Sequence, residues 1–330
     1  MKNNIFSIKK LKNLILLGSA PFIKDLENIC KKQNINFFFI STKDQINNLE
    51  YVPKKTLSIE KLNELKILSF LNFLKFDNQS LVISIGARWI FKSEHINNLF
   101  NNRLVNCHGT RLPIDRGGGG FSWRIMRGDR LGNILLHLID EGIDSGPIIY
   151  NDVYVIPINL NSPEEIEEDY KNRLKDFLVN LIKDSSKKTR NFQIQYQQNS
   201  ISSYFPRLKT STNGYVDWNW EPNEIQKFIL AFDNPYSGAK TYLNKKEVSI
   251  KKTQLHVGEI KTHIFQSGLI IRKTDKWCIV ALKNGYSLII ETVKNKKNIN
   301  IIKNIKVGDR FWTPSKKIES AKNYRFIIKN

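Results

Sequence analysis

A short stretch in the first half of the chain combines an amide, an imidazole and a run of glycines. Asn106 and His108 end a predicted strand, and four successive glycines follow at 117–120. Residues two apart in a strand project from the same face, so this amide and this imidazole are predicted neighbours. The pair, although a common one, suits a reaction in which one group polarises a carbonyl and the other handles a proton.

The glycine run indicates a binding loop. Four successive glycines cost chain entropy unless the backbone adopts positive φ or approaches another group closely. A flexible linker is the alternative, but linkers seldom lie between a strand end and the start of a Trp-containing helix. We therefore predict a substrate-binding turn formed by Gly109, Thr110, Arg111, Gly117, Gly118 and Gly119.

A second polar loop supplies a carboxylate. Asp144 lies on a glycine-framed loop after a predicted strand at 134–139. In open α/β sheets ligands gather at the carboxyl ends of strands, so this loop and the turn after His108 are expected to meet there. His137 is an alternative second base, but a buried, hydrogen-bonded core histidine is favoured. The His and Cys residues show no closed ligand spacing, so no metal is predicted.

The helices and strands that must position these residues follow two different sequence patterns, one in each part of the chain. Apolar strands at 13–17, 36–40, 81–85 and 104–106 alternate with helical patterns, including 61–76, and predict a mostly parallel sheet covered on both faces. A helix is expected after the acidic segment 163–169, up to about residue 183, and a linker or hairpin from there to 203. Short alternating segments follow residue 204 and are typical of a small antiparallel barrel or sandwich. We predict two domains, 1–203 and 204–330.

The joint pattern resembles the active-site signature of the folate-dependent formyltransferases. It spans about 45 residues in the family's order, and three segments at 204–208, 214–218 and 231–239 resemble the family's inter-domain region. Val257-Gly258 and Val307-Gly308-Asp309 resemble parts of its C-terminal barrel. The signature positions are Asn106, His108, Leu112, Pro113, Arg116, Gly117, Trp123, Gly128, Gly132, Asp144, Ser145 and Gly146.

This resemblance implies a Rossmann-like catalytic domain, an OB-like C-terminal domain and a 10-formyltetrahydrofolate donor. Asn106 would donate to the oxyanion, His108 would accept the amine proton or stabilise the oxyanion, and Asp144 would hold and polarise His108. The donor would lie along the strand end 84–90 and the loop 138–144. The implied donor-binding residues are Ser84, Gly86, Trp89, Ile90, Ile139, Asp140 and Gly142.

Two acceptors compete within this family. One is the amine of a nucleotide-linked amino sugar, used for surface polysaccharides such as lipopolysaccharide, and the other is methionyl initiator tRNA. The tRNA branch usually carries a basic insertion after its second strand, which residues 41–48 lack, and its turn after the His differs from Gly109-Thr110-Arg111. Arg111 and Arg116 suit a pyrophosphate, although Arg116 equally suits a structural tie. We favour the sugar nucleotide.

The charge distribution keeps the tRNA alternative open. Residues 201–330 carry 24 basic and 10 acidic side chains, net +14, against 28 and 21, net +7, for residues 1–200. The positive charge of residues 201–330 suits a phosphate-rich partner. Compositional drift, which scatters lysines over the solvent-exposed surface, explains the same charge equally well. A non-enzymatic RNA-binding factor is a further, less favoured interpretation.

Other features indicate a cytoplasmic protein without a membrane partner. The apolar run at 14–17 is shorter than the roughly 7–15 residues of a secretory signal core. The three scattered cysteines predict neither a disulfide framework nor zinc. An exposed apolar face on the C-terminal barrel would allow a homodimer.

Overall fold

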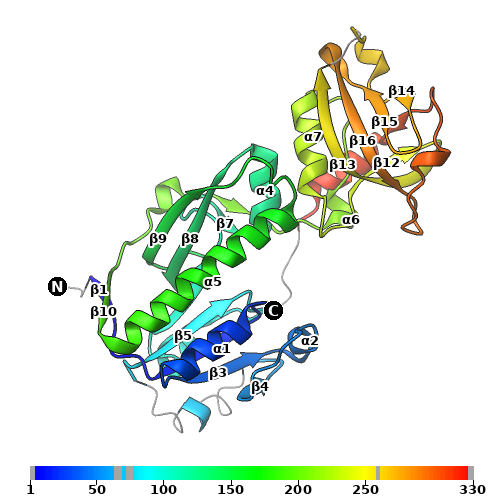
Figure 1. Cartoon of the computed structure of the whole chain (residues 1–330). Helices are drawn as coiled ribbons and strands as arrows, with labels where there is room; N and C mark the ends of the chain where they lie inside the picture. The colour runs from blue at the N-terminus through cyan, green and yellow to red at the C-terminus, as the bar shows by residue number, and fades with distance from the viewer. Residues whose placement is uncertain (1–3, 63–68, 72–76, 258–260, 326–330) are drawn as a thin grey trace.

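The structure is a computed structural model that describes residues 4–62, 69–71, 77–257 and 261–325. Most of the predicted helix at 61–76, and Gly258 of the Val-Gly pair, lie outside these residues. Its first sheet has seven strands, and Figure 1 shows them with α1 and α5 on the same side. The strand order is β4 (Thr56–Ser58), β3 (Asn36–Ser41), β2 (Asn13–Gly18), β5 (Ser80–Ile85), β6 (Leu104–His108), β8 (Leu131–Leu138) and β9 (Ile148–Val155).

The first sheet is covered on both faces, because apolar side chains from the central strands point to either side of it. In β2, Leu14 and Leu16 pack in one core cluster with α1 (Ile23–Lys32) and α5 (Pro163–Lys187). Ile15 and Leu17 pack on the other face, beside the short helix η1 (His95–Leu99). The five strands from β4 to β6 are parallel, while β8 and β9 are antiparallel. The predicted mostly parallel α/β sheet is confirmed.

Helix α5 begins earlier than predicted. Ser162 accepts from the Glu165 backbone and Glu165 returns a bond to Ser162, a capping box that satisfies the first free N–H groups. Pro163 fits the first turn, where its missing N–H is not needed. The acidic segment 163–169 is therefore part of the helix, which continues to Lys187.

The polar stretch after α5 is mostly not a linker. It contains β10 (Arg190–Gln193), which pairs with β1 (Ile5–Ile8), and the short helix η2 (Asn199–Ile201). Strand β11 (Tyr204–Phe205) then pairs in parallel with β7 (Arg116–Gly117), inside the glycine-rich turn.

The second sheet is antiparallel and curls on itself, as predicted. Its order is β14 (Ile270–Lys273), β15 (Cys278–Ala281), β16 (Tyr286–Lys294), β13 (Lys246–Val257), β12 (Ala239–Leu243) and β17 (Phe311–Trp312). Phe311 N donates to Gly268 O at 2.8 Å, and Ile270 N donates to Asp309 O at 2.8 Å. These bonds join the two ends of the sheet.

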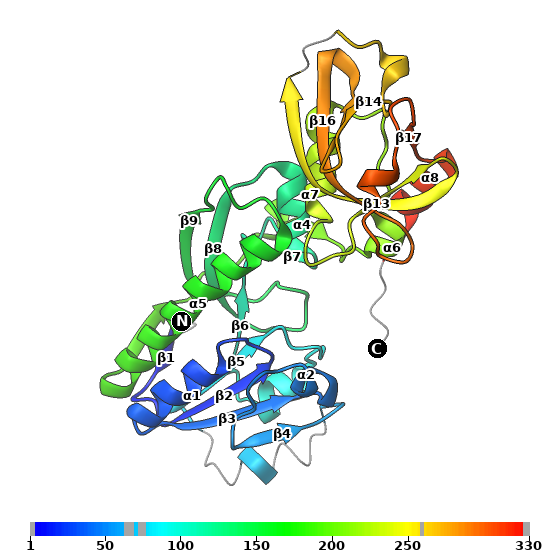
Figure 2. The same ribbon diagram turned by 45° about the vertical axis from the view of Figure 1, so that its right-hand side comes forward.

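Helix α7 (Pro222–Ala231) links the second sheet to the first part of the chain. Ser122 Oγ, on α4 (Gly120–Arg127), donates to Ala231 O at 2.8 Å. Figure 2 shows α4 and α7 together between the two sheets. The remaining helices are α2 (Lys43–Asn47), α6 (Thr210–Asn213), α8 (Ser315–Asn323), η3 (Ile264–Gln266), η4 (Lys283–Gly285) and η5 (Ile302–Asn304). Among the described residues, no helix is both long enough and apolar enough to cross a membrane.

Candidate active site

Strand β6 presents Asn106 and His108 at the middle of the first sheet. Asn106 pairs with Ser84 of β5 on one side and with His137 of β8 on the other. Both side chains are partly accessible, whereas Cys107 between them is 8 % exposed. The period-two alternation of the strand therefore places the amide and the imidazole on one face, as predicted.

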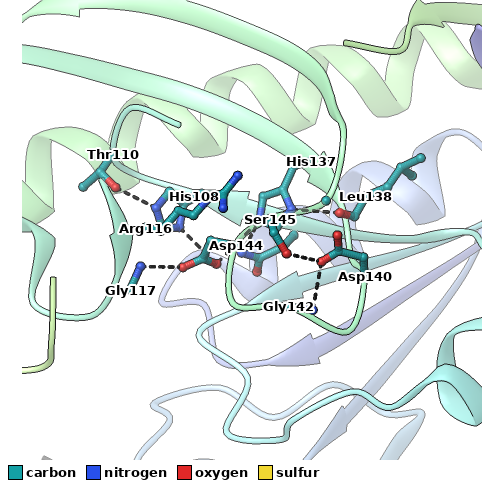
Figure 3. A network of polar contacts seen from close by, with 12 residues as sticks. His108, Thr110, Arg116, Gly117, His137, Leu138, Asp140, Gly142, Asp144 and Ser145 are labelled. Atoms are coloured by element: carbon teal, nitrogen blue, oxygen red, sulfur yellow. Dashed lines mark hydrogen bonds and ion pairs between the residues drawn. The ribbon is translucent and has the colours of Figure 1, made fainter. Parts of the chain in front are cut away.

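Asp144 reaches this face by a different route from the one predicted. Because β8 is antiparallel, its carboxyl end lies beside Val105 and not beside His108. The expectation that both turns meet at carboxyl strand ends is therefore wrong. The loop 139–147 instead folds back, and Asp144 Oδ1 lies 3.7 Å from His108 Nδ1 and 3.7 Å from His137 Nε2 (Figure 3).

The hydrogen bonds of His108 indicate its tautomer. Nε2 lies 3.1 Å from Asp115 O and 2.6 Å from Thr110 Oγ1, and the Thr110 hydroxyl donates to Asp115 O at 2.9 Å. A carbonyl oxygen only accepts, so the contact with Asp115 needs a proton on Nε2. In the neutral ring Nδ1 then carries the lone pair, and it faces Asp144.

The electrostatics of the pair favour a neutral imidazole beside a charged carboxylate. Burial lowers the pKa of His108, against the opposing effect of Asp144. Burial raises the pKa of Asp144, but His108, His137 and the Gly117 N–H outweigh it and lower the pKa to about 2. His108 is thus a base without a proton at Nδ1, next to an anion that would stabilise the protonated form.

His137 is buried, as predicted, but it also contacts the site. Its Nδ1 lies 2.8 Å from Leu138 O, which requires a proton on Nδ1, so in the neutral ring Nε2 is an acceptor. Asn106 Nδ2 lies 3.1 Å from that Nε2 and donates to it. The ring therefore fixes which end of the Asn106 amide points toward β8.

The glycine-rich turn holds Asp144. Gly117 N donates to Asp144 Oδ2 at 2.9 Å. Gly117 has φ +101, and a Cβ there would lie 2.3 Å from Phe205 O, so β7 and β11 can pair only through a residue without a side chain. A Cβ on Gly118 would lie 2.9 Å from Arg207 Cβ. Part of the glycine run is thus explained by the close approach of the inter-domain segment.

The residues predicted to bind the acceptor divide into two groups. Gly109, Thr110 and Gly117 line a cavity of about 260 Å³ that His108 also borders. Arg111, Gly118 and Gly119 do not line it.

Both candidate pyrophosphate ligands already have partners. Arg111 Nη2 lies 2.5 Å from Asp129 Oδ2. Arg116 donates to Gln197 Oε1 at 3.0 and 2.9 Å, and to Asn199 Oδ1. A substrate phosphate would therefore have to compete with these partners, and the structural tie anticipated for Arg116 is the arrangement that the structure describes.

The residues predicted to bind the donor flank β6 on both sides, because Ile139 and Asp140 follow β8, while Ser84 and Gly86 lie at the end of β5. Gly86 lines the same cavity as His108. Leu138, Ile139 and Asp140 line a cavity of about 360 Å³. Asp140 Oδ1 accepts from Gly142 N at 3.1 Å and from Ser145 Oγ at 2.7 Å, which shapes the loop rim.

The remaining donor-side residues are more dispersed. Ser84 is buried in β5, and Gly86 follows that strand with φ +58. Ile90 is 49 % exposed, while Trp89 Nε1 donates to Glu60 O at 3.2 Å.

The fold also brings together three side chains of kinds that can bind a metal ion, although their spacing in the sequence does not predict it. Ligand atoms of His108, His137 and Asp144 lie within 4.8 Å of one another. Hydrogen bonds to Asn106 and Gly117 already account for the positions of His137 and Asp144. The arrangement therefore needs no ion to explain it.

Comparisons with known proteins bear on the family. A family model described as the formyl transferase C-terminal domain matches residues 209–307. The bifunctional polymyxin resistance protein ArnA of Wigglesworthia glossinidia brevipalpis is 29% identical over 277 residues, which cover 82% of this chain and 39% of that protein. The chain is therefore similar to formyltransferases both in its C-terminal part and over most of its length. The resemblance that the sequence motifs carried is thereby confirmed.

Other formyltransferases are also similar to this chain. The methionyl-tRNA formyltransferase of Ruminiclostridium cellulolyticum is 28% identical over 191 residues, which cover 57% of this chain and 58% of that protein. The chain thus spans 39% and 58% of these two relatives' lengths. A solved N-formyltransferase from Helicobacter canadensis, in complex with folinic acid and dTDP-3-aminofucose, shares the fold. Its TM-score is 0.60 at 20% identity, with 85% of this chain and 99% of that chain covered.

Proposed function

We propose that this chain is an enzyme that transfers the formyl group of 10-formyltetrahydrofolate to the amine of a nucleotide-linked amino sugar. One observation carries the proposal. A proton-free ring nitrogen of His108 lies 3.7 Å from the carboxylate of Asp144, the Asn106 amide lies on the same face of the strand, and His108 borders a cavity. Acyl transfer to an amine needs a carbonyl-polarising donor and a group that takes the amine proton.

Each side chain has a role in the proposed reaction. The Asn106 amide gives one N–H to His137 and has a second for the formyl oxygen as negative charge develops there. His108 Nδ1 accepts the proton that the acceptor amine loses. Asp144, 3.7 Å away, stabilises the resulting imidazolium and stays ionised throughout.

The two cavities suggest where the substrates bind. The loop 138–142 and the end of β5 would hold the folate donor, which supplies the formyl carbon. The acceptor amine would enter from the cavity lined by Gly109, Thr110 and Gly117. His108 borders this second cavity, so an amine arriving from that side would meet the imidazole ring.

The surface beside the acceptor cavity supports a small acceptor over a polyanion. A neighbouring hollow of about 470 Å³ shares Pro21, Phe22, Glu167 and Lys171 with that cavity. It is also lined by Asp25, Glu164 and Glu168. Lys171 is paired with Glu167 at 2.8 Å, and with Lys175 also in the lining the four carboxylates outnumber the two lysines. Carboxylates repel phosphate groups, and tRNA carries many more of these than the one diphosphate of a sugar nucleotide, so the acidic hollow disfavours tRNA more strongly.

Methionyl initiator tRNA remains the second candidate acceptor. The observation that favours it is the net +14 of residues 201–330, together with the methionyl-tRNA formyltransferases among the relatives. Under this alternative the basic half would bind the tRNA body. Its signature would be a steep loss of affinity with salt.

One assay separates the two acceptors. Purified protein and 10-formyltetrahydrofolate are incubated with a panel of amino-sugar nucleotides and, separately, with charged initiator tRNA. We expect formylation of at least one sugar nucleotide, abolished in Asn106→Ala. Formylation of the tRNA alone would replace the sugar assignment.

The compartment and partners follow from this proposal. Both candidate acceptors and the folate donor are cytoplasmic metabolites, so we place the protein in the cytoplasm. A homodimer through the second sheet, and the boundary between residues 203 and 204, remain predictions.

A further inference from the structure

Gln197 connects the Asp144 loop to the glycine-rich turn. Its Nε2 donates to Asp144 O at 2.9 Å and to Gly146 O at 2.6 Å. Its Oε1 accepts two bonds from the Arg116 guanidinium, at 3.0 and 2.9 Å. The side-chain amide of Gln197 thus accepts from the glycine-rich turn through its oxygen and donates to the Asp144 loop through its nitrogen.

The Asp144 backbone needs such support. Asp144 has φ +51, the left-handed conformation that a residue with a side chain adopts at a cost. Strained backbone persists at functional sites only when the surroundings hold it. The Gln197 amide binds the carbonyl of this same residue.

The two ends of Asp144 are thus fixed by adjacent residues of one turn. Gly117 N holds the carboxylate at Oδ2. Arg116, the preceding residue, holds Gln197, which holds the Asp144 carbonyl. This leaves Oδ1 facing His108 and His137.

We propose that Gln197 is a positioning residue for the reaction, which holds Asp144 in its left-handed conformation and so keeps Oδ1 against His108. The inference rests on the proposed function for its catalytic consequence. It does not depend on which acceptor the enzyme uses. Gln197 lies in the segment that the sequence analysis interprets as a linker or hairpin.

Gln197→Glu tests the donor half of the amide. A carboxylate of the same shape still accepts from Arg116, but it has no N–H for the carbonyls of Asp144 and Gly146. Gln198→Glu is the matched control, because Gln198 is the exposed neighbour and receives the same charge. We expect kcat to fall on the order of 10- to 100-fold in Gln197→Glu, as misplaced catalytic groups do. KM for the donor should change little, and Gln198→Glu should resemble the wild type.

A second measurement needs no turnover. NMR titration of the His108 ring is compared in wild type, Asp144→Asn, Gln197→Met and Gln198→Met. The Asp144 charge favours protonated His108, so losing it lowers the His108 pKa. Gln197→Met should shift that pKa downward, like Asp144→Asn, while Gln198→Met should not.

The outcomes separate the two proposals. A folded Gln197→Glu with the kcat of Gln198→Glu, or an unmoved His108 titration in Gln197→Met, would overturn the positioning role. If the wild type formylates neither class of acceptor, the proposed function fails, but the NMR comparison still decides whether Gln197 positions Asp144.

Discussion

The Asp144 carboxylate lies close to the imidazole rings of His108 and His137. It is largely shielded from solvent, because the side-chain exposures are 16% for Asp144 and 12% for His108. Asp144→Asn keeps the shape but removes the charge that stabilises protonated His108. We expect the variant to fold and its kcat to fall by orders of magnitude. Circular dichroism checks the fold and single-turnover kinetics check the rate. Near-normal turnover would show that Asp144 only shapes the loop.

The pH dependence of kcat follows from the same pair. His108 must be neutral to accept a proton, and burial lowers its pKa below the usual value of about 6.5. Activity should therefore hold through neutral pH and decline only as the pH falls below that value. Asp144 stays charged to about pH 2 and adds no limb in this range. An acid limb above pH 7 in the kcat profile would contradict this assignment.

His137 should act through Asn106. His137→Leu removes the acceptor for Asn106 Nδ2, so the amide loses its fixed orientation. We expect kcat to fall about fivefold, since a hydrogen bond of this kind contributes about 1 kcal/mol. His137→Gln, which offers an amide oxygen, should retain more activity.

A double-mutant cycle tests that coupling. In an Asn106→Ala background, His137→Leu should lower kcat little further, because the effects of two residues that act through one another are not additive. Thermal unfolding of each variant controls for stability. If the fold-decreases in kcat of the two single variants multiply in the double variant, His137 has a role that does not depend on Asn106.

At the scale of elements, the pair β7 and β11 depends on a residue without a side chain. Gly117→Ala places a Cβ 2.3 Å from Phe205 O at φ +101. We expect destabilisation of about 1–3 kcal/mol, together with loss of activity as the Gly117 N–H leaves Asp144. Gly285→Ala is the control, because φ is +76 there but no atom lies within 4 Å of the new Cβ. Urea unfolding and kcat measure both effects, and equal losses in the two variants would rule out the close contact as the cause.

The elements that the sequence predicts well are those with a strong local pattern. The strands at 13–17, 36–40 and 81–85 each contain four apolar residues out of five, and the structure confirms each of them. Two-residue strands such as β7 and β11 carry no period to detect, because long-range pairing alone defines them. The direction of β8 is equally invisible, since an apolar run does not encode whether its neighbour is parallel.

The same limit applies to the candidate site. Asn106 and His108 share one strand, so their proximity could be predicted from spacing alone. The contact of His137 with Asn106 depends on the antiparallel register of β8 against β6. Gln197 contacts Asp144 across 53 positions, and its surroundings in the sequence are polar and without pattern. No local signal marks either residue.

At the scale of the whole molecule, the segment after residue 203 contacts the first part of the chain as well as leading into the second sheet. A fragment of residues 1–203 lacks β11, whereas a fragment of residues 1–208 keeps it. Both lack α7, whose Ala231 packs in one cluster with Ile125 of α4 and Ile166 of α5. We expect thermal stability to decrease from the full chain to 1–208 and then to 1–203. A 1–203 fragment as stable as 1–208 would show that β11 adds nothing to the first sheet's part of the chain.

The bonds that join Gly268 and Ile270 to residues 309–311 have a consequence for self-association. Sheets most often aggregate or assemble by adding strands at an open edge, where backbone N–H and C=O groups are free. Here β14 and β17 occupy each other's edges, so strand addition to this sheet would first have to break those bonds. Copies of the chain that associate through this sheet would instead meet through side chains, such as the 75 % exposed Phe265. A charged substitution at such a side chain should therefore weaken association of this kind while the backbone bonds between the two ends of the sheet stay in place.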